Sequence, residues 1–257
     1  MTHIKSILTP IFASLSLLLI APVHSAAADF FDTRPADKFL EIGIHGLAGT
    51  STLLQNYQSC YPAITDIDMS AGFAGGVGGS VTFGLRNYLA LSTELNFMAR
   101  NSSTSMAFRG IDEIPTSAIR LSNRSYSFEV PVYVSVRFNL ADNVRWNLQG
   151  GFYYSLGLTG TQHQTLMSSY INELGQMVNI YEKVDADYYN DPDAFINSQY
   201  RSDWGLMVGT SIDVWKHVTV GFRTMFGLKN VANDSDSGTI HPRVRNLAAL
   251  GTVGWRF

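Results

Sequence analysis

The stretch NLAALGTVGWRF, residues 246–257, decides the fold because its alternate positions form two unlike faces. One face holds only apolar residues and glycine, and it ends in Trp255 and Phe257. The other face mixes apolar residues with Asn246 and Arg256. Because successive side chains of a strand point to opposite sides of its sheet, we expect a strand with lipid on one side and a mixed interior on the other.

The same alternation recurs along the chain and predicts eight strands. An even number of strands of roughly ten residues is typical of a closed antiparallel barrel, because lipid offers no partner to an unpaired strand edge. We therefore predict an all-β fold, an eight-stranded antiparallel transmembrane β-barrel. The predicted strands are 40–45, 73–83, 89–97, 128–138, 145–158, 203–214, 218–227 and 246–257.

The connections between these strands alternate between long and short without exception. Long extracellular loops and short periplasmic turns are typical of outer-membrane barrels, so we expect both mature termini in the periplasm. In the third long connection, residues 166–183 could instead form a hairpin that turns near 173–176, or add two strands to give ten. The long connections are 49–72, 101–124, 159–202 and 229–245, and the short ones are 86–87, 140–143 and 215–217.

The composition favours a lipid environment. Of the 257 residues, 46% are apolar and only 15% are charged, whereas roughly 25% are charged in a soluble domain. A net charge of −3 argues against nucleic acid as a partner, because broad capture of phosphate backbones needs a basic surface. Beyond the N-terminus no apolar run reaches the about 20 residues that a membrane helix needs, so a membrane would be crossed by strands.

The N-terminus has the features of an export signal. Lys5 supplies a positive charge, residues 11–20 form a short apolar core, and small residues follow at 22–28. We expect a signal peptide over residues 1–27 and an outer-membrane β-barrel domain over residues 28–257. The single cysteine, Cys60, provides no disulfide framework and is interpreted as an incidental loop residue.

Four short segments carry a resemblance to a known family. GFAGG at 72–76, NYLALSTEL at 87–95, YSFEVP at 126–131 and WRF at 255–257 resemble the PorT-type outer-membrane β-barrel family of Bacteroidota. The resemblance implies an outer-membrane protein of a Gram-negative bacterium, with a secretion-accessory role as in the best-known member. It offers no catalytic motif. We also interpret Trp255 and Phe257 as a C-terminal signal for the barrel-assembly machinery.

Alternation places four acids and four bases inside the barrel. The opposite placement would put arginine on lipid, at a cost of about 2–4 kcal/mol each near the membrane midplane. Since eight strands enclose only enough room for their own side chains, we predict a salt-bridged plug, with a narrow passive channel as the alternative. The acids are Glu41, Glu94, Glu129 and Asp213, and the bases are Arg137, Arg145, Arg223 and Arg256.

Two local features of the barrel wall lead to further expectations. Gly76 and Gly78 leave room for long side chains from neighbouring strands. Pro131 has no amide hydrogen, and inside a strand it indicates a bulge or a local register break. A bulge would re-aim the nearby Glu129.

The long segment 159–202 is rich in tyrosine and acidic residues, which suits contact with a protein or a sugar. Its aspartates lack the spacing of a calcium loop, so we expect no metal site, and no cofactor. An enzyme that modifies lipid A is the other alternative, but neither polar set at the outer rim matches a catalytic motif. These sets are His163, Thr165 and Ser168, and Asp234, Asp236 and His241.

These observations predict a non-enzymatic membrane-anchored protein that acts through binding or assembly. The expected partners are the lipid of the outer membrane, the barrel-assembly machinery and an envelope protein complex. No nucleic acid is expected.

Overall fold

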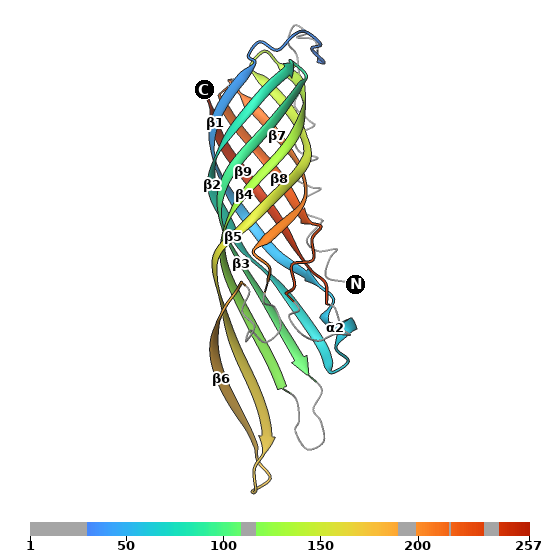
Figure 1. Cartoon of the computed structure of the whole chain (residues 1–257), viewed down its shortest axis with the longest axis vertical. Helices are drawn as coiled ribbons and strands as arrows, with labels where there is room; N and C mark the ends of the chain where they lie inside the picture. Colours follow the sequence, from blue (N-terminus) through green and yellow to red (C-terminus); the bar gives the residue numbers. More distant parts are fainter. Residues whose placement is uncertain (1–29, 109–116, 190–198, 216, 234–241) are drawn as a thin grey trace.

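The computed structural model describes residues 30–108, 117–189, 199–215, 217–233 and 242–257. The predicted signal peptide, 1–27, lies outside these residues. Within them, eight antiparallel strands form a closed ring, in which the last strand pairs back with the first (Figure 1). This confirms the prediction of an eight-stranded barrel. In ring order the strands are β1 (Leu40–Gln55), β2 (Ile64–Arg86), β3 (Leu89–Phe108), β4 (Ser117–Ala141), β5 (Val144–Ile171), β7 (Ser202–Val214), β8 (Val218–Gly227) and β9 (Val244–Arg256).

Two further elements lie outside the ring. The strand β6 (Met177–Asp187) pairs with β5 alone, and the short helix α2 (Tyr57–Cys60), which carries the free Cys60, connects β1 to β2. No helix in the described ranges is long and apolar enough to cross a membrane.

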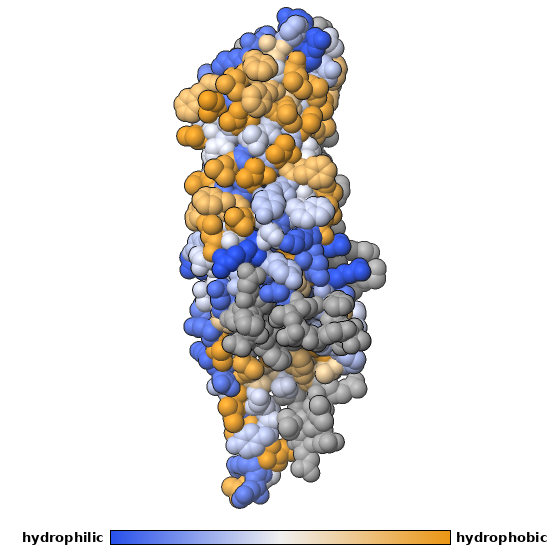
Figure 2. All heavy atoms as spheres, viewed as in Figure 1, coloured by the Kyte–Doolittle hydropathy of each residue, from blue (hydrophilic) through white to orange (hydrophobic). Residues whose placement is uncertain are grey.

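The two faces of each strand differ as the alternation predicts. On β4 the outward side chains of Phe128, Val130 and Val132 are exposed, whereas those of Glu129 and Tyr133 are buried in the lumen. Apolar side chains gather over the end of the barrel that carries the short turns (Figure 2). This band is the surface that lipid would cover.

At the opposite end, the strands run further than predicted (Figure 1). The predicted loops 49–72 and 101–124 are wrong in extent, because β1 continues to Gln55, β2 begins at Ile64, β3 continues to Phe108 and β4 begins at Ser117. Beyond the apolar band both faces of a strand can be polar, so the alternation fades while backbone pairing continues. We call this opposite end of the barrel the loop end, and the end with the short turns the turn end.

Much of the predicted loop 159–202 is likewise a hairpin. β5 runs to Ile171 and turns through residues 172–176 into β6, at the position expected from the sequence. Gly175 has φ 72, a left-handed conformation that favours glycine. Because β6 does not enter the ring, the ten-strand alternative is wrong.

The bulge or register break predicted at Pro131 is also wrong. Val132 pairs with Thr93 and Glu129 pairs with Asn96, so the spacing is equal on both strands and the register is unchanged. The pairs between these two are missing from the β3–β4 ladder, as a residue without an amide hydrogen would cause. The register shifts of β4 lie instead at Tyr126/Ser127 and at Asn139/Ala141, where it pairs with β5.

Candidate functional site

The middle of the lumen is organised around the carboxylate of Glu94, which is buried. The two terminal guanidinium nitrogens of Arg223 lie 2.6 and 3.0 Å from its oxygens. The Tyr133 hydroxyl donates to Glu94 at 2.7 Å and the Asn96 amide at 3.0 Å, while the His45 ring lies 3.3 Å away. Side chains from β1, β3, β4 and β8 therefore meet at one charge, which satisfies the need of a buried carboxylate for partners.

Gly78 on β2 makes room for this cluster. A Cβ atom at Gly78 would lie 1.9 Å from the Asn96 amide oxygen. This is the role expected from the sequence for Gly76 and Gly78.

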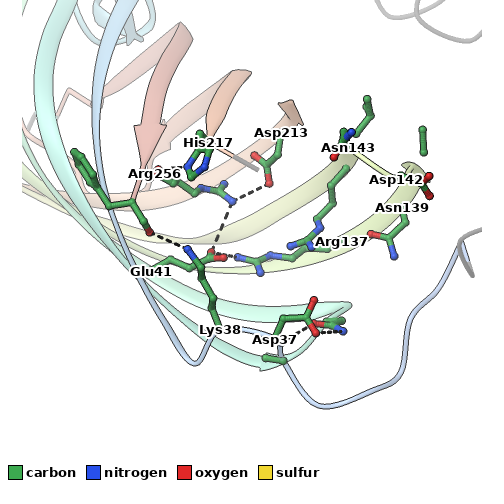
Figure 3. A pocket seen from close by; sticks show the side chains of 16 residues that line it. Asp37, Lys38, Glu41, Arg137, Asn139, Asp142, Asn143, Asp213, His217 and Arg256 are labelled. Carbon is green, nitrogen blue, oxygen red and sulfur yellow. Dashed lines mark hydrogen bonds and ion pairs between the residues drawn. The ribbon is translucent and has the colours of Figure 1, made fainter. Parts of the chain in front are cut away.

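A second ionic cluster lies at the turn end (Figure 3). Glu41 lies 3.1 Å from Arg137 and 3.8 Å from Arg256. Arg256 also pairs with Asp213 at 2.7 Å, and the Thr219 hydroxyl donates to Asp213 at 2.8 Å. The cluster connects β1, β4, β7, β8 and β9, and so ties the first strand of the ring to the last.

A third cluster lies toward the loop end. Arg100 pairs with Glu129 at 2.5 Å. Asp203 accepts hydrogen bonds from the Tyr153 hydroxyl at 3.0 Å and from the Asn246 amide at 2.9 Å.

Seven of the eight charged residues expected in the lumen thus form ion pairs. The exception is Arg145, which lines a cavity at the turn end but whose side chain makes no ion pair or hydrogen bond within the described residues. The clusters also contain His45, Arg100, Tyr133 and Asp203, which are not among the eight. Alternation already placed His45, Tyr133 and Asp203 on inward faces, whereas Arg100 followed the last predicted residue of its strand.

Apolar layers separate and cover the ionic clusters. One layer in the lumen includes three buried methionines, Met98, Met207 and Met225, packed with Leu47 and Leu250. A second, at the loop end, gathers residues of β1–β4 and β9 with α2 and Val231. Its buried members are Leu53, Tyr57, Ile64, Met106, Ile119, Leu121, Val231, Ala232 and Val244.

These layers lead us to expect no steady ionic conductance from the folded barrel. Two cavities, of about 330 and 40 Å³, lie in the lumen toward the turn end. Side chains of the methionine layer lie buried beyond them. Recordings from the purified protein in planar bilayers test this, with heat-denatured protein as the control. Reproducible current steps from the folded form alone would support the narrow channel.

The chain before β1 forms the rim of the larger cavity. The Asn87 side chain donates to Asp32 at 3.0 Å and accepts from the Asp37 amide at 2.9 Å. Hydrogen bonds from Arg34 and Asn87 hold the pKa of Asp32 well below its usual range. Lys38 is thereby placed at the cavity, with its ammonium 3.5 Å from the Phe257 carbonyl oxygen.

The polar residues at the outer rim do not assemble into a catalytic group within the described residues. His163 lies 2.6 Å from Asp185 across the β5–β6 hairpin, and both are exposed. Thr165 and Ser168 are on the same strand as His163, but no hydroxyl group in the described part of the chain hydrogen-bonds to its ring. The other expected set, Asp234, Asp236 and His241, lies outside the described residues.

Two remaining expectations concern metals and the C-terminus. No group of three or more His, Cys, Asp or Glu side chains is placed to hold a metal ion in the described ranges. Trp255 and Phe257 are exposed on the outer surface at the turn end, where Trp255 stacks on His217 with 5.3 Å between ring centroids.

Comparison with known protein families gives a match over most of the chain. A family model described as "Outer membrane protein beta-barrel domain" matches residues 30–233. This description is broader than the PorT-type resemblance and names no phylum. No curated protein matched the sequence.

Solved structures show weaker similarity. Ail of Yersinia pestis, in complex with the heparin analogue sucrose octasulfate, is 10% identical, with a TM-score of 0.36 over 86% of this chain and 100% of that chain. The protease OmpT of Escherichia coli is 12% identical, with a TM-score of 0.41 over 91% of this chain and 99% of that chain. Neisserial surface protein A is 10% identical, with a TM-score of 0.32 over 84% of this chain and 97% of that chain. Similarities of this size transfer no function.

Proposed function

We propose a function from the premise that this chain belongs to the family of outer membrane protein beta-barrel domains. It is an integral outer-membrane β-barrel protein of a Gram-negative bacterium. We infer that the barrel is a non-enzymatic anchor, which displays the β5–β6 hairpin and its neighbouring loops outside the cell for binding or assembly. In this orientation the turn end, with both mature termini, faces the periplasm.

The observation that carries this proposal is the exposed apolar surface of the β5–β6 hairpin. The hairpin projects beyond the rest of the barrel, away from the apolar band (Figure 1). At and near its turn, Leu174 is 82% exposed, Met177 64% and Tyr181 63%. Apolar side chains in such numbers outside the lipid band favour contact with a partner, and tyrosine supplies rigid amphipathic contact area.

The partner class that we favour is an envelope or surface protein complex. The PorT-type resemblance supports a secretion-accessory complex in particular. Recognition of Trp255 and Phe257 by the barrel-assembly machinery would precede the association with either kind of complex. A lipid A-modifying activity is disfavoured, because the exposed His163–Asp185 pair has no hydroxyl nucleophile bound to it in the described residues.

Crosslinking and affinity capture from native outer membranes test the proposal. We expect a stoichiometric partner to be captured by the wild type. A variant in which Leu174, Met177 and Tyr181 are all replaced by serine should capture at least about tenfold less, since it loses three large apolar contacts. The matched control replaces Glu173, Glu182 and Lys183 by serine on the same hairpin. Equal capture by both variants, or recovery of the barrel alone from the wild type, would contradict a binding role of this surface.

A further inference from the structure

The larger cavity, at the turn end, has the dimensions of a ligand site. It measures about 330 Å³, and pockets for small molecules begin at about 300 Å³. The proposed role of the hairpin makes no use of it. Residues of β1, β4, β5, β7 and β9 and of the chain before β1 surround it (Figure 3).

Two arginines in this cavity carry donors that the described residues leave unused. Asn139 on β4 pairs with Arg145 on β5, and Arg137 pairs with Asn147, so the two arginines lie diagonally on adjacent strands. Arg137 is buried and gives one terminal nitrogen to Glu41, but its Nε has no hydrogen-bond partner. Arg145 is half-buried and makes no ion pair within the described residues. Neighbouring like charges repel each other, and a buried donor without a partner is costly, so both would be stabilised by an anionic acceptor.

The acids of the cavity do not supply that acceptor. Glu41 and Asp213 are held by Arg137 and Arg256 in the ionic cluster. The other two, Asp37 and Asp142, are exposed at the rim. The cavity therefore offers positive charge on its half-buried wall. At its opening lie the carboxylates of Asp37 and Asp142, together with Lys38, whose ammonium lies 3.5 Å from the Phe257 oxygen.

We propose that this cavity binds a small amphoteric molecule, an amino acid or a short peptide with a free carboxylate. The carboxylate is held by Arg145, with Arg137 beside it, and the ammonium faces Asp37 and Asp142. A bidentate guanidinium–carboxylate pair provides both strength and orientation. In the orientation proposed above, the cavity opens to the periplasm.

Calorimetric titration of the detergent-folded full-length barrel tests the site with four probes. These are alanyl-alanine, its C-terminal amide, its N-acetyl derivative and inorganic phosphate. We expect alanyl-alanine to bind, the amide to bind at least about tenfold more weakly through loss of a charge-assisted pair, and the N-acetyl derivative about threefold more weakly. Phosphate should bind more weakly than alanyl-alanine.

Substitutions assign the binding to the cavity. Arg145→Gln should weaken alanyl-alanine binding about tenfold, whereas Arg120→Gln, which changes an exposed arginine of β4 at the loop end, should leave it unchanged. Equal binding by Arg145→Gln, equal binding of the amide, or no binding by the wild type would overturn the proposal. Phosphate binding as tight as that of the dipeptide would overturn the amphoteric ligand in favour of a simple anion. None of these results depends on the hairpin, so they are distinct from a failure of the proposed binding role.

Discussion

Glu94→Ala is expected to destabilise the folded barrel by about 3–5 kcal/mol, because it leaves Arg223 buried without its counter-charge. Arg223 makes both of its close ionic contacts with this one carboxylate, and Tyr133 and Asn96 donate to the same group. The loss of one acid therefore leaves several buried donors unsatisfied. Urea unfolding in detergent micelles, followed by tryptophan fluorescence, measures the change.

Two further variants separate the ion pair from a general effect of substitution. Glu94→Ala combined with Arg223→Met removes both charges and should recover much of the lost stability, since paired replacement of buried ions is often tolerated. Glu182→Ala, on the exposed hairpin, should change the stability by less than about 0.5 kcal/mol. A Glu94→Ala barrel as stable as the wild type would show that the cluster does not hold the lumen together.

Val132→Arg is expected to cost about 2–4 kcal/mol, the price of an arginine on the lipid face near the membrane midplane. Val132 is 45% exposed in the apolar band of β4. Unfolding in lipid vesicles measures this cost.

Val184→Arg is the matched control for this substitution. Val184 is 41% exposed, close to the value for Val132, but it lies on β6 in the hairpin. An arginine there meets water, so we expect a change below about 0.5 kcal/mol. Equal costs at the two positions would contradict the placement of the membrane.

The strands of the membrane band could be predicted from the sequence because lipid and lumen demand different side chains. The outward Phe128, Val130 and Val132 alternate with inward Glu129 and Tyr133, and this period marks the strand. Beyond the band no lipid contacts the outer face, so apolar side chains are no longer required there. The Ser- and Thr-rich residues 102–105 continue β3 without any alternation to reveal it, so the predicted loops were too long.

For the lumen, the sequence predicts only which face of its strand each side chain lies on. Alternation indicates that Glu94 and Arg223 both point inward, but not that they meet. Their contact joins β3 to β8 across the lumen, and the stagger of the strands sets which inward residues share a level. Alternation also places Arg145 inside the barrel, and it was therefore expected in the ionic plug. Its level in the lumen could not be predicted, and in the structure it lies at the wall of the cavity.

Surface accessibility of the hairpin turn tests the central claim, a barrel that displays its loop end outside the cell, most directly. An epitope inserted after Leu174 should bind antibody on intact cells, whereas the same epitope between Asp142 and Asn143, in a short turn, should bind only after the outer membrane is permeabilised. The reverse pattern, or an epitope after Leu174 that stays hidden until permeabilisation, would contradict the orientation and the display of the hairpin.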